Sequence, residues 1–167
     1  SQREGLVETG AYVFRHSLTA RQQVVALLRP AMEVRGLRTF AVLAPENRLG
    51  NEMAELFVRE VELRGGEIVG TQHYEESASD FRRQIKLLKG EDPNLPDVDD
   101  DKRNAGKDKG VKKDPDPPPF QAIFIPDDAK RVGLIAPQLA FYGVDGVQLL
   151  GTNAWNSSDL VKIGGRF

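Results

Sequence analysis

Cysteine is missing from the 167-residue chain, so disulfides, thiol nucleophiles and thiolate metal sites are excluded together. No apolar run approaches the ~20 residues that a membrane-spanning helix needs. Lysine and arginine, 23 in total, do not outnumber the 25 acidic residues, and a net charge of −2 argues against a nucleic-acid partner. Because the chain begins with Ser1, we expect a processed or excised piece, so a missing signal sequence says little about its parent.

The common catalytic motifs are missing as well. The segment 44–50 follows a strand but has neither dinucleotide-binding nor Walker spacing, and no G-x-S-x-G nucleophile elbow occurs. The two histidines, His16 and His73, have no Ser or Asp partner by position, and we expect both to be structural. The chain is therefore predicted to be non-catalytic, with no cofactor and no metal.

The stretch from Thr39 to Tyr74 indicates the fold. It begins with a short apolar run of the kind that suits a strand buried on both faces. Apolar residues then recur at helical spacing from Leu49, with charged residues between them, until two glycines at 65 and 66 end the pattern. A second strand follows. Strand, helix and strand in about 35 residues form a βαβ unit, which requires parallel pairing and a right-handed crossover.

The rest of the chain repeats this pattern. Thr19 and Gln22 fit a capping box that starts a helix, and Phe81 opens another apolar stripe. Pro30 and Pro137 fall inside helical patterns, where a proline is expected to kink or interrupt the helix. We predict an α/β fold, an open doubly wound and mostly parallel sheet of about four to five strands with helices on both faces. Further strands are expected at 12–15, 120–125 and 147–150, and further helices at 127–143 and 157–163.

Residues 90–119 interrupt this organisation. They contain six of the ten prolines and many charges, and their few apolar residues have no period. Such a segment buries too little apolar area to offset the entropy of ordering it, so we predict a long disordered insert. Residues 1–11 are predicted to be a flexible lead-in, and 12–167, apart from the insert, a single lobe.

In open α/β sheets, ligands sit beyond the carboxyl ends of the strands, which selects the loops at 44–50, 126–129 and 151–156. Glu46, Asp127 and Asp128 could cluster there as a magnesium site. The alternative is that one aspartate caps a helix and Glu46 is a solvated turn residue, and we favour it because Asp is a preferred N-cap. Trp155 could either stack on a ligand or partner, or pack against the last helix.

Several motifs together resemble one protein family. The motifs are Tyr12-Val-Phe-Arg15 before a capped helix, P-E-N-x-x-G after a strand, the strand Gly66–Val69, and Ser79-Asp-Phe81. In this order they resemble the second lobe of type I periplasmic solute-binding proteins, of which the branched-chain amino-acid binders are the best-known group. Two further stretches, 120–128 and 135–142, look closer to a lipoprotein branch described as penicillin-binding-protein activators.

The resemblance implies one lobe of a two-lobed fold, with the ligand between this lobe and a first lobe of the same parent chain. In this family, second-lobe ligand contacts come from the positions matching Leu49 and Gly50, the loop 127–129, and Asn153. Two departures from the family pattern weaken the case for an amino-acid ligand. Leu49 stands where amino-acid binders often have an aromatic residue, and Asn153 stands where they have an acid that holds the ligand amine. The expected ligand-binding residues are Glu46, Leu49, Gly50, Asp127, Asp128, Asn153 and Trp155.

Three functions follow as hypotheses. The leading one is a non-catalytic lobe of a bacterial periplasmic or envelope protein that binds a small ligand, an amino acid or small carboxylate, or an envelope protein. The second is an activator lobe that contacts a peptidoglycan synthase. The third is a magnesium-dependent phosphoryl-transfer domain that uses Glu46 and Asp127.

Overall fold

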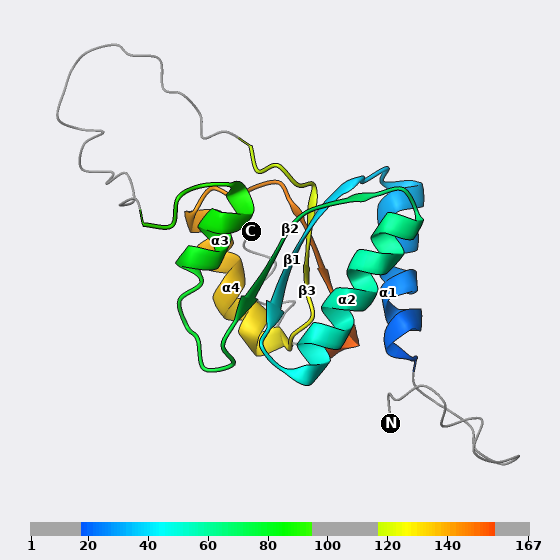
Figure 1. Ribbon diagram of the computed structural model, residues 1–167, viewed down its shortest axis with the longest axis horizontal. Helices are drawn as coiled ribbons and strands as arrows, with labels where there is room; N and C mark the ends of the chain where they lie inside the picture. Colours follow the sequence, from blue (N-terminus) through cyan, green and yellow to red (C-terminus); the bar gives the residue numbers. More distant parts are fainter. Residues whose placement is uncertain (1–17, 95–116, 156–167) are drawn as a thin grey trace, which may run out of the picture.

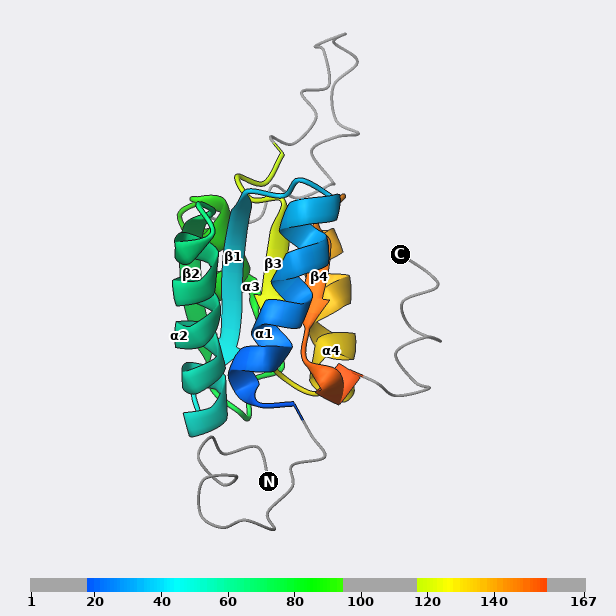
Figure 2. The same cartoon turned by 90° about the vertical axis from the view of Figure 1, so that its right-hand side faces the viewer.

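The computed structural model describes residues 18–94 and 117–155. Their core is a four-stranded, fully parallel sheet in the order β2-β1-β3-β4. Helices cover both faces of the sheet, as Figures 1 and 2 show, with α1 and α2 on one side and α3 and α4 on the other. The predicted fold class is confirmed. The strands are β1 (Thr39–Pro45), β2 (Glu67–Tyr74), β3 (Ala122–Ile125) and β4 (Gln148–Gly151), and the helices are α1 (Ala20–Arg29), α2 (Arg48–Leu63), α3 (Arg82–Lys89) and α4 (Ala129–Phe141).

Side chains of the two central strands point alternately to the two faces of the sheet, so the core consists of two clusters. In β1, Phe40 and Val42 pack toward α1 and α2, whereas Ala41 and Leu43 pack toward α3 and α4. All four are fully buried, which explains why the sequence shows an unbroken apolar run instead of polar alternation. β3 divides in the same way, with Ala122 and Phe124 on the first side and Ile123 and Ile125 on the second.

Aromatic stacking joins α2 to the sheet. Phe57 of α2 lies flat on Phe124, with ring centroids 4.2 Å apart, and meets Phe40 edge-on at 5.8 Å. Phe57 is fully buried, so the apolar stripe predicted for this helix does face the core. No helix in the described residues is long and apolar enough to pass through a membrane.

The capping box at the start of α1 is confirmed. The Thr19 hydroxyl accepts from the Gln22 amide at 3.1 Å, and the Gln22 side chain accepts from the Thr19 amide at 2.9 Å. Pro30 then changes the helix as expected, because it has no N–H for the next helical bond. The chain continues as one π-helical turn, Pro30–Val34, closed by the Arg35 amide donating to the Pro30 carbonyl at 3.1 Å.

Two helix predictions need correction. The sequence at 77–80 predicts the start of the third helix, but α3 begins at Arg82, directly after Phe81, whose amide donates to the Gln138 side chain of α4 at 2.9 Å. The predicted interruption of α4 at Pro137 is wrong: the helix runs through it. Pro137 is on the exposed side of α4. Gly90 ends α3 with a φ of 78°, a left-handed conformation that glycine adopts without strain.

Four predictions fall outside the described residues. They are the lead-in 1–11, the strand at 12–15, the central part of the insert (95–116) and the helix at 157–163. They stay predictions from the sequence.

Candidate functional site

The strand order creates one position where neighbouring loops separate. β1 lies between β2 and β3, so the loop after β1 leads to α2 on one face, and the loop after β3 leads to α4 on the other. In open α/β sheets this switch point is where a crevice forms. A hollow of about 170 Å³ lies there, at the carboxyl ends of β1, β3 and β4. It is lined by Gln23, Pro45, Asn47, Leu49, Met53, Pro126, Asp127, Asp128, Thr152, Asn153 and Ala154.

Asn47 forms the first wall of the hollow, at the start of α2. Its side-chain oxygen accepts from the Gly50 amide at 2.7 Å and so caps the helix. Gly50 sits directly over Pro45, and a β-carbon at position 50 would lie only 2.3 Å from the Pro45 carbonyl oxygen. A glycine is therefore required for the helix to start this close to the end of β1.

Asp127 and Asp128 form the second wall, at the start of α4. The Asp128 side chain accepts from the Arg131 amide at 2.8 Å, which confirms the predicted aspartate cap of this helix. Asp127 accepts from the Tyr74 hydroxyl at 2.7 Å and from the Asp128 amide at 2.7 Å. Burial, followed by the hydrogen bond to the Asp127 carboxylate, raises the pKa of Tyr74, so this buried hydroxyl remains a donor.

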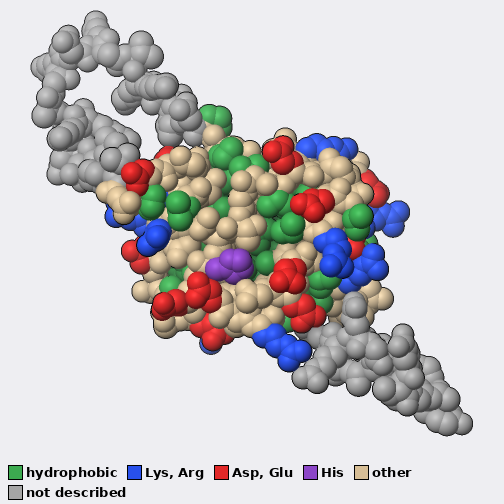
Figure 3. All heavy atoms as spheres, viewed as in Figure 1, with side chains coloured by type: hydrophobic (Ala, Val, Ile, Leu, Met, Phe, Trp, Pro, Cys, Tyr) green, Lys and Arg blue, Asp and Glu red, His purple; other side chains and the backbone are tan. Residues whose placement is uncertain are grey.

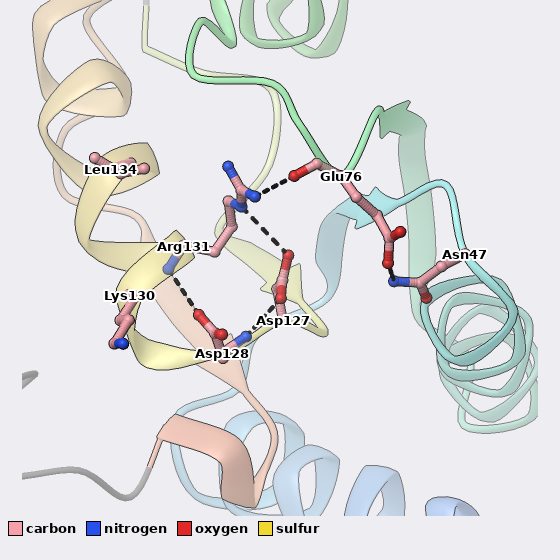
Figure 4. Close-up of a pocket in the computed structure, with 7 residues that line it drawn as sticks. All are labelled: Asn47, Glu76, Asp127, Asp128, Lys130, Arg131 and Leu134. Atoms are coloured by element: carbon pink, nitrogen blue, oxygen red, sulfur yellow. Dashed lines mark hydrogen bonds and ion pairs between the residues drawn. The ribbon is translucent and has the colours of Figure 1, made fainter.

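A second hollow, of about 380 Å³, adjoins the first and shares three of its residues (Figure 4). Its inner wall is Arg131, whose guanidinium group donates to the carbonyl oxygens of Glu76 and Ala78 in the β2–α3 loop. The Glu76 carboxylate in turn accepts from the Asn47 side-chain amide at 2.5 Å. The β2–α3 loop therefore connects the starts of the two helices. The lining residues are Asn47, Glu76, Asp127, Asp128, Lys130, Arg131 and Leu134.

Four of the seven predicted ligand-binding residues line the hollow at the switch point: Leu49, Asp127, Asp128 and Asn153. Leu49 is half exposed, and Asn153 begins a short 3₁₀ turn, Asn153–Trp155, after β4. Glu46 and Gly50 are not among the lining residues. Glu46 is exposed and faces another hollow beside β2, and the Gly50 amide is already used by Asn47.

Trp155 is also outside this hollow. Its ring lies on Gly151, where a β-carbon would be 1.9 Å from a ring atom, and it packs against the core cluster of α3 and α4. The predicted last helix lies outside the described residues, and within them Trp155 packs on the sheet. Its ring N–H is buried and finds no acceptor among residues 18–94 and 117–155.

Sequence reasoning missed Tyr74 and Asn47. Tyr74 was assigned only to the end of a strand, and no local pattern indicates that its hydroxyl reaches a residue 53 positions away. Asn47 did carry a signal, because Asn is a preferred cap and lies three residues before Gly50.

The magnesium alternative gains no support from this geometry. In the parts of the chain that the structure describes, no three His, Cys, Asp or Glu side chains come together as a metal site. Asp128 is used as a cap and Asp127 as an acceptor for Tyr74, so the favoured structural interpretation of these two residues accounts for both.

Comparison with known proteins shows the family of this chain. A family model described as periplasmic binding protein matches residues 1–167, the whole chain. The chain belongs to the periplasmic binding protein family. No curated protein matches the sequence significantly.

Solved periplasmic binding proteins share the fold at low sequence identity. A leucine-binding protein from Thermotoga maritima is 17% identical, with a TM-score of 0.68 over 95% of this chain and 37% of that one. A branched-chain amino acid transporter protein from Streptococcus pneumoniae, solved with isoleucine, is 18% identical, with a TM-score of 0.66 over 97% and 38%. An ABC-transporter solute-binding protein from R. palustris, solved with 4-hydroxybenzoate, is 17% identical, with a TM-score of 0.63 over 96% and 37%.

These comparisons establish the fold of this periplasmic binding protein chain and its extent. The chain spans little more than a third of the length of each of the three solved proteins. The three solved proteins are solute-binding proteins, a non-enzymatic class, and this agrees at family level with the predicted lack of catalysis.

Proposed function

We propose that this chain is the second lobe of a periplasmic or envelope-associated solute-binding protein, and that the switch-point hollow is its half of a ligand site. The observation that carries the proposal is the position of this hollow. It lies at the carboxyl ends of the strands, between the starts of α2 and α4, in a chain of the periplasmic binding protein family. A first lobe of the same parent chain would cover it.

The lining suggests which part of a ligand this lobe would meet. Pro45, Leu49 and Met53 supply an apolar side, and Asp127 and Asp128 supply two carboxylates opposite. An amine or a hydroxyl is favoured next to these carboxylates, whereas a ligand carboxylate would be repelled and would have to face the other lobe. Both an amino acid and a hydroxylated small carboxylate meet this requirement. Solved neighbours with isoleucine and with 4-hydroxybenzoate indicate that the fold accommodates both classes.

One lobe alone, which forms only half of the cleft, should bind small molecules weakly. Good small-molecule sites bury about 70–90% of the ligand surface, and one open wall cannot do this. We expect the 167-residue chain to bind amino acids and small carboxylates in the millimolar range or not at all, about −4 kcal/mol at best. The two-lobed parent should bind one of them at least about a hundredfold more tightly, because closure of the lobes removes water from the polar contacts.

Calorimetry with a panel of amino acids and hydroxybenzoates, run on the chain and on the parent, tests this proposal. Asp127→Asn in the parent should weaken binding, and Glu33→Gln, at an exposed position that lines neither hollow, is the matched control. A micromolar ligand for the isolated chain would contradict the half-cleft interpretation.

A second candidate is an activator lobe that contacts a peptidoglycan synthase. It is supported by the outer face of α4, where Leu134 and Phe141 are exposed at 48% and 74%, one on each side of the exposed Pro137. Exposed large apolar side chains in a row are typical of a protein contact. The variant Phe141→Ser, at a position that lines neither hollow, should lose retention on an immobilised synthase and leave small-ligand binding by the parent unchanged.

A further inference from the structure

β2 forms one edge of the sheet. In the described part of the chain, β2 pairs only with β1 and is the first strand of the sheet. Figure 1 shows β2 in front of the other strands, between α2 and α3, and Figure 3 shows the same face, with few charged side chains along its middle. An open edge strand presents unpaired N–H and C=O groups that can pair with another extended chain.

The hydrogen bonds of β2 identify which residues face outward. The Tyr74 carbonyl accepts from the Glu46 amide at 2.7 Å and so points toward the β1 side. The His73 carbonyl accepts from the Gln84 side chain of α3 at 3.3 Å. Because successive residues of a strand alternate in direction, the backbone groups of Thr71 and His73 point away from β1. The pairing with β1 skips Val69, a bulge, so the regular part of the edge is Gly70–Tyr74.

Two hollows lie on opposite sides of this regular part. One, of about 640 Å³, lies between β2 and α2 and is lined by Thr71, His73 and residues of α2, among them Val58. The other, of about 380 Å³, lies between β2 and α3 and is lined by Gln72, Tyr74 and residues of α3, among them Leu87. A strand added to β2 would point its side chains alternately to the two faces of the sheet, one set into each hollow.

The charge around the hollows indicates what kind of strand would bind. Exposed carboxylates outnumber guanidinium groups on both sides of the edge, with Glu55, Glu62 and Arg59 next to one hollow and Glu46, Glu75 and Arg83 next to the other. A second copy of this chain would bring the same acidic residues against themselves, which is unfavourable. A segment with lysine or arginine at alternate positions would direct all of these side chains to one face of the sheet, where they meet the carboxylates of one hollow, and its other side chains to the second hollow.

We propose that the β2 edge is a docking site for an extended, basic segment of a partner protein, which pairs with the backbone of Thr71 and the N–H of His73 and places its side chains in the two hollows. This mode of recognition takes its affinity from main-chain hydrogen bonds and its specificity from the side-chain hollows. The proposal does not depend on the ligand site at the switch point, because neither hollow shares a residue with it.

A peptide of about seven alternating lysine and valine residues, long enough to form one strand, is the probe. In an NMR titration of the 167-residue chain, it should shift the amide signals of Thr71 and His73 and saturate. A glutamate–valine peptide should bind about tenfold more weakly or not at all. The Thr71→Pro variant should lose the interaction without unfolding the sheet, because the outward N–H that it removes makes no bond to β1.

Variants that reverse the charge beside one hollow test the proposal without the proline substitution. Glu55→Lys with Glu62→Lys should reverse the preference in favour of the glutamate–valine peptide, and Glu33→Lys, which lines neither hollow, should leave it unchanged. Three outcomes would overturn the proposal: no shifts at Thr71 and His73, equal binding of both peptides, or self-association of the chain through β2 in sedimentation.

Discussion

At the scale of single residues, the short distance between α2 and the end of β1 determines which side chains fit at the switch point. Gly50 is buried over Pro45 because α2 starts immediately above the end of β1. The family resemblance suggests Gly50 as a ligand contact, which stays a prediction, and the structure adds a packing requirement at this position. Asn47 and Leu49 are the residues of this loop that line the hollow, and both are more exposed than the buried Gly50.

We predict that Gly50→Ala destabilises the fold by about 1–3 kcal/mol, the usual cost of forcing an extra carbon into a packed site. The new methyl would meet a backbone carbonyl oxygen at 2.3 Å, so the start of α2 must move. Gly70→Ala is the matched control, because its nearest neighbour is a flexible Leu88 methyl at 3.2 Å. Urea denaturation of both variants measures the difference, and equal midpoints would contradict the prediction.

At the scale of secondary-structure elements, a buried carboxylate ties α1 to α2. The Glu60 side chain of α2 is only 3% exposed and accepts from Arg21 of α1 at 2.8 Å and from Arg64 one turn along its own helix. The hydrogen bond from Arg64, then that from Arg21, lowers the pKa of Glu60 below its ordinary value of 4.5. The charged form is thus favoured in the folded state.

We predict that Glu60→Gln destabilises the protein by about 1–3 kcal/mol at neutral pH, since hydrogen bonds to a charged group are lost at a buried position. A lowered folded pKa gives stability that is present above the unfolded pKa and is lost as the pH falls through the folded pKa. The difference from wild type should therefore be constant near neutrality and should shrink in acid, below about pH 4.5.

Urea denaturation at about pH 7 and about pH 3 checks this dependence. Glu33→Gln is the control, because the Glu33–Arg29 pair is exposed on both sides and should contribute less than about 1 kcal/mol. An effect of Glu60→Gln that is as large in acid as at neutrality would show that shape, not charge, is what this position requires.

The sequence predicted elements better than it predicted contacts between them. The spacing of apolar residues, the helix caps and the glycines that end helices predicted every described strand and α-helix, because each of these signals is local. The start of the third helix was predicted too early, at 77–80, and no local signal indicates that the Phe81 amide before α3 donates to Gln138, 57 positions further along the chain. The same limit applies to the site: the loops at 44–50 and 126–129 were predicted, whereas Tyr74 and the Glu76–Asn47 bond depend on tertiary contacts.

At the scale of the whole molecule, the sheet joins the two core clusters. Both central strands contribute buried side chains to each cluster in alternation, so neither face can lose its helices without exposing a strand that the other face needs. Because the switch-point hollow is built from loops of both faces, its geometry depends on both clusters being intact.

We predict that the described part of the chain unfolds as one cooperative unit. Trp155, the only tryptophan, packs on the cluster of α3 and α4, whereas the helical circular dichroism of the described residues comes from helices on both faces, α1 and α2 included. Fluorescence and far-ultraviolet circular dichroism should therefore give coincident urea transitions, as two-state unfolding requires. Leu28→Ala, in the opposite cluster, should move both transitions together and cost about 2–5 kcal/mol, because the residue is fully buried. If that variant moved the dichroism midpoint and left the fluorescence midpoint in place, the two faces would be independent, and the central strands would not couple them.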